Sequence, residues 1–277
     1  MYKKSLSYPH LFWMVLFVVA PMVLIFAYAF THPDGSFTLE NFKKFFDPMY
    51  ISILAESLWI ALLSVLFCLL FGYPAALILA NKDRRRMAAG KKTSGLLMLF
   101  VMPMWMNMML RLYSWLTIIG DGGVLNTFLG AIGLPQIDIM YTTHAVILGT
   151  VYDFIPFMIL PIYSVLIKID DSVIEAAQDL GANSFKVFYK VILPLSMPGV
   201  ISGITMVFLP ALTSFYIADF FGGGKFMLIG NVIEKSFKSP TLRNFGSAMS
   251  IILMIFAFLS MRLTKILNKS NRQLSMF

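Results

Sequence analysis

The chain has 277 residues, of which 58% are hydrophobic and only 13% are charged, and its mean hydropathy is +0.79. A soluble domain carries about a quarter charged residues, so this composition excludes a soluble enzyme, a disordered protein and a secreted disulfide scaffold. The single cysteine, Cys68, excludes an intramolecular disulfide. The net charge of +8 would suggest nucleic acid as a partner in a soluble protein. In a membrane protein the placement of the positive charges is more informative.

Six apolar windows are long enough to cross ~30 Å of hydrocarbon, which takes roughly 20 helical residues. Only short loops remain between them, so we predict an all-α membrane protein with six transmembrane helices and a single domain over residues 1–277. The first window also resembles a signal peptide, since Lys3 and Lys4 precede it and a small-residue site follows at 27–29. Its length and the five later windows favour an uncleaved helix. The windows lie at about 11–30, 57–80, 93–110, 143–167, 196–218 and 244–261.

The basic residues divide unequally between the two sides of the membrane. With the N-terminus inside, 15 of the 22 lysines and arginines fall on the inner side, and this bias predicts that both termini are cytoplasmic. Six of them lie within 82–92, which we interpret as a topology determinant beside anionic membrane lipid rather than as a nucleic-acid patch. On this topology Arg111 belongs to an outer segment, 111–142, which we expect to fold partly back along the membrane surface.

The cytoplasmic segment 168–194 predicts a helix–turn–helix. Ser172 and Glu175 have the spacing of a capping box that opens a helix over about 173–180. Gly181 then supplies the left-handed residue that ends this helix. An apolar stripe on the helix needs a surface to pack against, either on the chain itself or on a separate cytoplasmic protein. The stripe consists of Val173, Ile174, Ala177 and Leu180.

The same segment resembles the EAA loop of bacterial ABC importer permeases. That motif is EAA, three residues, G, nine residues and I-x-L-P, and this chain has it with Val191 in place of the isoleucine. The resemblance implies the type I ABC importer transmembrane architecture, with 173–181 as a coupling helix seated in a cleft of an ATP-hydrolysing subunit. The coupling residues that it implies are Glu175, Ala176, Ala177, Gly181, Leu193 and Pro194.

The sequence lacks a nucleotide-binding loop of the form G-x-x-x-x-G-K-[S/T]. The run Gly90-Lys91-Lys92-Thr93 ends like one, but Arg85 stands where the first glycine is required. We therefore expect no ATP hydrolysis, no catalytic residue, no metal and no cofactor in this chain, and an importer built on it needs a separate ATPase subunit.

Over its whole length the chain is similar to the permeases of spermidine/putrescine importers, the PotB-type family. Beyond the EAA loop, the similarity rests on Leu209-Pro210-Ala211, Phe215-Tyr216, Asp219 and the run 228–233. The resemblance implies a multi-pass protein of the bacterial cytoplasmic (inner) membrane. It also implies three partners: an ATPase in two copies, a second homologous permease (PotC type) and an extracytoplasmic polyamine-binding protein (PotD type).

Two acidic residues are candidates for a cation pathway. Placing Asp153 inside the fourth window costs about 2.5–3.5 kcal/mol, so we expect it to face the interior and to have a partner. Asp219 closes the fifth window. Aromatic residues beside them offer cation–π contacts of ~0.5–2 kcal/mol each. Two alternatives stay open: Asp153 as a hydrogen-bond anchor for a threonine or tyrosine, and Asp219 as a solvated helix end. The candidate pathway residues are Asp153, Asp219, Tyr152, Phe157, Phe215 and Tyr216.

The sequence therefore predicts a permease subunit that translocates polyamines by alternating access. An ABC permease for another small organic solute is the alternative within the same class. A passive channel or a membrane scaffold is the alternative from a different class, and the EAA loop argues against it. An intramembrane enzyme lacks support, because the windows hold neither an H-E-x-x-H motif nor a serine–histidine pair.

Overall fold

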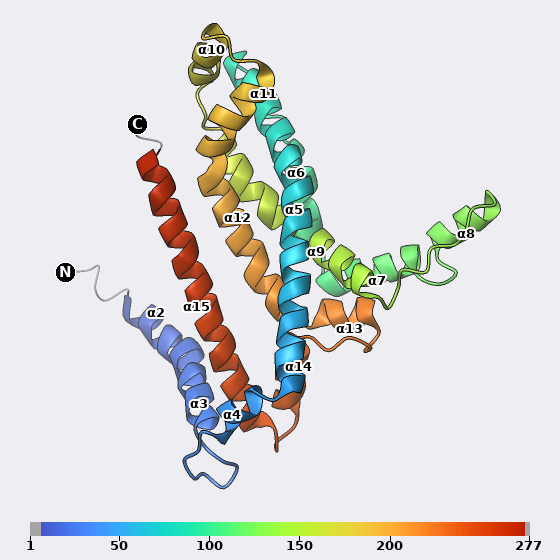
Figure 1. Cartoon of the computed structure of the whole chain (residues 1–277), viewed down its shortest axis with the longest axis vertical. Coiled ribbons are helices and arrows are strands. Elements are labelled where there is room, and N and C mark those ends of the chain that lie inside the picture. Colours follow the sequence, from blue (N-terminus) through green and yellow to red (C-terminus); the bar gives the residue numbers. More distant parts are fainter. Residues whose placement is uncertain (1–6, 275–277) are drawn as a thin grey trace. The chain divides into compact units, whose positions relative to one another are not determined.

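The computed structural model describes residues 7–274, and every regular element in that range is a helix, apart from one isolated bridge between Thr31 and Phe37 (Figure 1). In chain order the elements are α2 (Ser7–Met14), η1 (Val15–Val19), α3 (Ala20–Ala29), α4 (Glu40–Phe45), α5 (Pro48–Ala88), α6 (Leu96–Val101), η2 (Met102–Trp105), α7 (Met108–Ile119), α8 (Val124–Ala131), α9 (Thr143–Leu166), α10 (Asp171–Asp179), α11 (Ser184–Val187), η3 (Phe188–Ile192), α12 (Leu193–Thr213), α13 (Tyr216–Gly222), α14 (Ile229–Lys238) and α15 (Arg243–Leu274).

Among the described residues, five helical stretches are long and apolar enough to cross a membrane, and one bent pair of helices brings the number to six. Four of the predicted windows fall, to within a residue, inside Tyr8–Ala29, Pro48–Ala88, Thr143–Leu166 and Arg243–Arg262. The basic residues Lys3 and Lys4, which contribute to the predicted orientation, lie outside the described residues.

The third window is not one straight helix, so that part of the prediction is wrong. The chain bends by 100° between Leu96–Trp105 and Met108–Ala131. Met106 is extended, and the side chain of Asn107 accepts a hydrogen bond from the backbone N–H of Met109 at 2.9 Å. Asparagine stabilises a new helix start in this way, so the chain begins α7 at Met108 instead of continuing the earlier helix. The expected outer segment 111–142 is accordingly helical over most of its first half.

The fifth window also differs from its expected bounds. The apolar helical stretch runs over Ser184–Thr213, and the backbone leaves helical geometry at Ser214, where ψ is 110°. A separate short helix, α13, then begins at Tyr216. Asp219 therefore lies in α13 and does not close the long helix.

The described residues form two compact units. The first comprises the described part of Met1–Glu56 together with Met227–Leu259. Its core contains Ala29, Ala248 and Ile251. The side-chain amide of Asn244 donates to the carbonyls of Tyr28 and Thr31 at 3.0 and 2.6 Å, and so ties α15 to the end of α3.

The second unit comprises Ser57–Phe226 with the described part of Ser260–Phe277. Its centre is α9, which packs along α12. Two glycines of α12 allow this close approach. A Cβ on Gly199 would lie 2.8 Å from the carbonyl oxygen of Pro161, and a Cβ on Gly203 would lie 2.7 Å from the sulfur of Met158.

Gly199→Ala should therefore destabilise the second unit. The new methyl group meets backbone atoms of α9 that cannot rotate away, and overpacking of this kind costs about 1–3 kcal/mol. Thermal melting of the purified protein in detergent should show a lower Tm. The control is Gly130→Ala in α8, where the nearest atom to an added Cβ is 3.8 Å away; its Tm should equal or exceed that of the wild type, because alanine loses less entropy on folding. An equal Tm in both variants would contradict the close packing.

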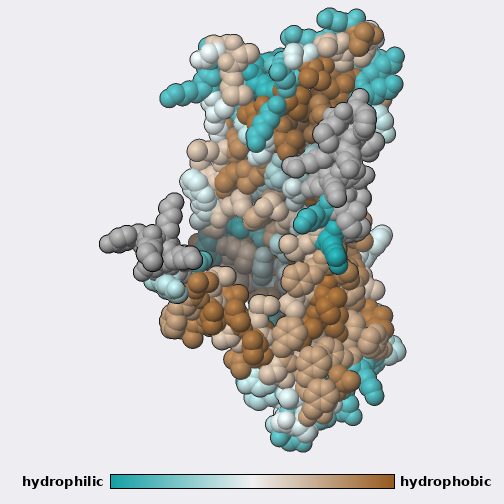
Figure 2. Space-filling view, turned by 90° about the vertical axis from the view of Figure 1, so that its left-hand side faces the viewer, coloured by the Kyte–Doolittle hydropathy of each residue, from teal (hydrophilic) through white to brown (hydrophobic). Residues whose placement is uncertain are grey.

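The surface of the protein is rich in hydrophobic side chains. Brown, hydrophobic residues make up a large share of the face shown in Figure 2. Within the described residues, Leu66, Leu70 and Ile78 on α5 and Phe258 and Leu259 on α15 are each more than half exposed. Such an exposed apolar surface is stable where lipid or an apolar partner surface covers it.

Candidate functional site

A buried carboxylate lies where α7, α9 and α13 meet. Nη2 of Arg111 lies 2.7 Å from Oδ1 of Asp153, and the two side chains are only 8% and 5% exposed. The hydroxyl of Tyr216 donates to Oδ2 of Asp153 at 3.3 Å. The expectation that Asp153 faces the interior and has a partner is confirmed, and a tyrosine donor is present, as the hydrogen-bond alternative proposed.

Local structure explains how these three elements reach one another. The Asn107 cap starts α7 one turn before Arg111, which directs this side chain from the bend toward α9. On α9, Gly149 has no side chain, and a Cβ there would lie only 3.1 Å from the ring of Phe221 on α13. This close contact lets α13, which carries Tyr216, approach α9.

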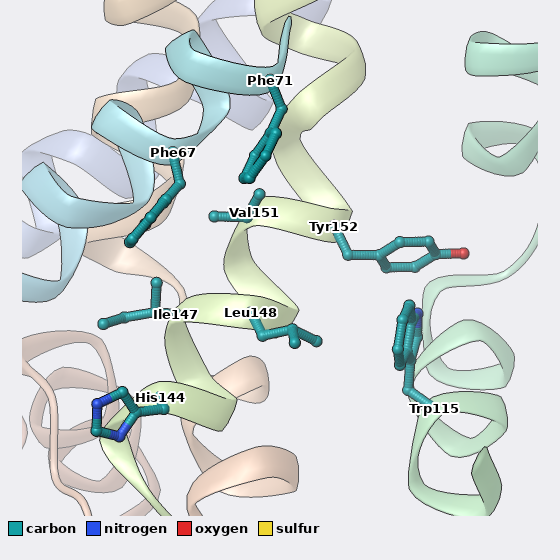
Figure 3. A pocket seen from close by; sticks show the side chains of 8 residues that line it. All are labelled: Phe67, Phe71, Trp115, His144, Ile147, Leu148, Val151 and Tyr152. Atoms are coloured by element: carbon teal, nitrogen blue, oxygen red, sulfur yellow. The ribbon is translucent and has the colours of Figure 1, made fainter. Parts of the chain in front are cut away.

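Aromatic rings surround the ion pair on one side. The guanidinium carbon of Arg111 lies 6.0 Å from the centre of the Tyr152 ring, and Trp115 meets the same ring edge-on at 5.1 Å. Tyr152 and Trp115 also line a pocket of about 360 Å³ between α5, α7 and α9 (Figure 3). Such a pocket can hold an alkyl chain. It is lined by Phe67, Phe71, Trp115, His144, Ile147, Leu148, Val151 and Tyr152.

The other predicted pathway residues lie further from the carboxylate. Phe157 is half-buried one turn beyond Asp153, and its ring packs against that of Phe154 at 6.1 Å. Phe215 meets Tyr216 edge-on at 5.8 Å. Asp219 is exposed, one turn further along α13. The structure thus brings Tyr152, Asp153 and Tyr216 together at one site.

Sequence reasoning missed Arg111, which it placed in an outer segment. A signal was present, because Arg111 is the only lysine or arginine between Lys92 and Lys168. An acid inside a membrane span pairs with another polar group. A lone cation beside an apolar window was therefore the natural partner of Asp153.

The EAA-like loop is a second candidate site. Its first helix, α10, begins at Asp171, and the carboxylate of Asp170 accepts a hydrogen bond from the backbone N–H of Ser172 at 3.0 Å. The predicted capping box of Ser172 and Glu175 is therefore wrong, because Asp170 already occupies the capping position. The hydrogen bonds from Ser172 hold the pKa of the Asp170 carboxyl below its usual value.

The end of α10 agrees with the prediction. Gly181 has φ +80°, which is the left-handed geometry that favours glycine. Its N–H bonds to the carbonyl of Gln178, and the N–H of Ala182 bonds to the carbonyl of Ala177 at 3.0 Å. This pair of bonds is the Schellman motif, and it fixes the direction in which the chain leaves the helix toward Leu193 and Pro194 at the start of α12.

The apolar stripe of α10 serves two surfaces. Leu180 is 90% exposed and Val173 is 44% exposed. Ile174 and Ala177 are half-buried, and Ile174 lines a cleft of about 350 Å³ that α5, α10, α11 and η3 enclose. The middle of the stripe thus packs partly on the chain itself, and Val173 and Leu180 at its two ends are open to a partner.

Arg84, near the end of α5, fastens this loop. The Arg84 guanidinium, 9% exposed, donates to the carbonyl of Ile169 at 3.1 Å and pairs with the carboxylate of Asp171 at 3.2 Å. The neighbouring Asp83 accepts hydrogen bonds from the Tyr163 hydroxyl at 2.8 Å and from a backbone N–H at residue 94. Arg84, a member of the basic run 82–92, is therefore a structural tie as well as a positive charge, and Asp83 joins α5 to α9 and to the segment after α5.

Comparisons with known proteins agree with this architecture. Residues 72–273 match the model of the family described as binding-protein-dependent transport system inner membrane component. The chain is 40% identical to the spermidine/putrescine transport system permease protein PotB of Haemophilus influenzae, over 93% of this chain and 92% of that protein. It is 42% identical to the Escherichia coli protein of the same name, over 93% and 96%.

A solved structure has a similar fold. A chain of a bacterial ABC transporter involved in the import of the acidic polysaccharide alginate superposes with a TM-score of 0.74 and 18% identity, over 96% of this chain and 94% of that one. At that level of identity the likeness concerns the fold alone.

Proposed function

Because this chain belongs to the family of binding-protein-dependent inner membrane transport components, we propose that it is the permease subunit of an ATP-driven importer of polyamines, spermidine and putrescine. The observation that carries this proposal is its 40% and 42% identity, over 93% of the chain, to two permeases named for spermidine and putrescine transport. The pairing of Asp153 with a cation inside an aromatic site supports a positively charged cargo.

The proposed assembly follows the architecture of such importers. The chain spans the bacterial inner membrane as one transmembrane domain, with both termini in the cytoplasm. A PotC-type permease stands beside it, a PotD-type protein delivers polyamine from outside, and two ATPase copies bind inside. The exposed Leu180 and the fixed turn at Gly181 support α10 as the element that inserts into the ATPase, together with Glu175, Ala176, Ala177, Leu193 and Pro194.

Uptake measurements test the cargo directly. Cells that lack their own polyamine importer should take up labelled spermidine and putrescine when this chain is expressed with its three partners. They should take up neither when the ATPase is omitted. Absence of uptake by the complete, membrane-inserted complex would overturn the proposed cargo.

Asp219→Asn should reduce uptake because it removes a negative charge from the proposed pathway and keeps the side-chain size. Asp219 is exposed on α13, so the loss should reach about fivefold at most, since an exposed ion pair contributes up to ~1 kcal/mol. The loss should be larger for spermidine, with three charges, than for putrescine, with two.

A matched control for Asp219 is Asp121→Asn. Asp121 is also exposed, but it lies in the glycine-rich turn before α8. Uptake by Asp121→Asn should equal that of the wild type. If Asp219→Asn also transported both polyamines at the wild-type rate, Asp219 would be a solvated helix residue outside the pathway.

A further inference from the structure

The Arg111–Asp153 pair has fewer hydrogen bonds than its burial demands. The two groups are 2.7 Å apart and almost fully buried. Even so, Oδ1 of Asp153 accepts no well-aligned hydrogen bond, and Nε and Nη1 of Arg111 have no partner among the described residues. A buried guanidinium stabilises a fold when its N–H groups are satisfied, and desolvation opposes a buried pair that leaves them unsatisfied. The guanidinium is therefore held mainly by its charge.

The surroundings of the Arg111 charge fit an organic cation in general. The Asp153 carboxylate provides the counter-charge, and the centre of the Tyr152 ring lies 6.0 Å from the guanidinium carbon. Tyr216 binds the second carboxylate oxygen and leaves Oδ1 facing Arg111. A primary ammonium group has the same requirements, because it pairs with a carboxylate and is attracted to an aromatic face. Arg111 thus occupies the place that the end of a polyamine would take.

Space for the remainder of such a ligand lies next to this position. The apolar pocket in Figure 3 shares Tyr152 with the ion pair, and it continues along α9 past Leu148 and Val151 to Phe67 on α5. Its volume is about 360 Å³, which is at the lower end of the range for small-molecule sites. The methylene carbons that separate the charges of a polyamine match these apolar walls.

We propose that Arg111 is a specificity-determining residue that acts as an internal competitor for Asp153, and that an ammonium group of the substrate displaces it during transport. In the unloaded permease the guanidinium neutralises the buried carboxylate. A substrate ammonium replaces Arg111 at the Asp153 carboxylate when it donates well-aligned hydrogen bonds and contacts the Tyr152 ring. A neutral solute leaves the Arg111–Asp153 pair intact. The long arginine side chain can withdraw without movement of α7. This inference rests on the proposed polyamine cargo and adds the residue that discriminates a charged substrate from a neutral solute.

The test is a double-mutant cycle on the complete complex, with Arg111→Gln, Asp153→Asn and the double variant. The readout is the affinity for labelled spermidine retained by the complex after trapping with a non-hydrolysed ATP analogue. Arg111→Gln should bind spermidine about tenfold more tightly than the wild type, the factor expected when a competing pair is formed about nine-tenths of the time. Asp153→Asn and the double variant should both bind more weakly than the wild type.

A purely structural ion pair makes the opposite prediction. Each single variant would then lower the yield of complex, and the double variant would recover both the yield and the wild-type affinity; that result would overturn the proposal. Arg111→Lys guards against a Gln variant that fails to assemble. It keeps the charge but loses the planar guanidinium, so its affinity should lie between those of the wild type and Arg111→Gln, and an unchanged affinity would overturn the proposal.

The wild-type complex separates this test from the test of the cargo. If the wild-type complex takes up no labelled spermidine, the proposed function fails. If it takes up spermidine and Arg111→Gln leaves the affinity unchanged, only the displacement of Arg111 fails.

Discussion

Gly181→Val is expected to reduce polyamine uptake by about tenfold while the permease remains in the membrane at its normal level. Gly181 has φ +80°, and no atom lies within 4 Å of the position that a Cβ would take. The effect is therefore one of backbone conformation and not of space. A left-handed backbone costs an L-residue roughly 1–2 kcal/mol, and more for a β-branched side chain, so the ratio of the native turn to other conformations should fall by about the tenfold that 1.4 kcal/mol represents.

The consequence reaches the ATPase because this turn directs α10. Without the Schellman bonds of Gly181 and Ala182, α10 would have a different direction, and the exposed side chain of Leu180 would no longer point toward the ATPase. Uptake of labelled spermidine and co-purification of the ATPase subunit should therefore fall together in Gly181→Val.

Gly181→Asn is the matched control for the valine variant. Asparagine adopts the left-handed region far more readily than valine, and the open space around the position accommodates its side chain. It should retain most of the uptake. Normal uptake and normal ATPase binding in Gly181→Val would show that the direction of this turn does not matter for coupling.

Features set by local chemistry could be predicted from the sequence. The apolar windows at 57–80 and 143–167 have the composition of a span, whatever surrounds them, and both lie within continuous helices. Gly181 could be predicted because few other residues end a helix in left-handed geometry. Asp153 was expected to have a partner because an unpaired acid is costly in a membrane. In each case one energetic term dominates the outcome.

The errors arose where two local signals compete. Asp170 and Ser172 both have side chains that cap helices, and the structure uses Asp170. Hydropathy favours a straight helix over 93–110, but the cap at Asn107 starts a new helix and bends the chain by 100°. This bend carries Arg111 from its expected outer segment to Asp153. The partner of an ion pair that joins positions 42 residues apart is set by tertiary packing, which no local pattern contains.

Arg84→Gln should abolish most of the coupling between this permease and its ATPase. The Arg84 side chain is 9% exposed and binds two groups at the start of α10. It donates to the carbonyl of Ile169, the residue before the helix cap, and it pairs with the carboxylate of Asp171, the first residue of α10. A hydrogen bond to a charged group contributes about 1.5–3 kcal/mol. Without these bonds α10 loses its polar ties to α5, so less of a movement of α10 that the ATPase imposes would reach the transmembrane helix.

The adjacent Arg85 provides a control with the same charge and the same helix. It is exposed and lines the same cleft as Ile174. Arg85→Gln removes one positive charge from the same basic run, so any effect on membrane orientation should be equal in the two variants. We expect Arg85→Gln to keep wild-type uptake and Arg84→Gln to lose about tenfold, the change that corresponds to 1.4 kcal/mol.

Two measurements separate coupling from folding in the Arg84 variant. The amount of permease in the membrane should be unchanged, because Asp83 still binds Tyr163 and the 90–95 loop. Stimulation of ATP hydrolysis by the loaded binding protein should fall with uptake, since both depend on a fixed α10.

Asp171→Asn should lose less uptake than Arg84→Gln, because Asp171 is 48% exposed and Arg84 keeps its bond to Ile169. Equal losses in Arg84→Gln and Arg85→Gln would mean that the charge of the basic run matters and the tie to α10 does not.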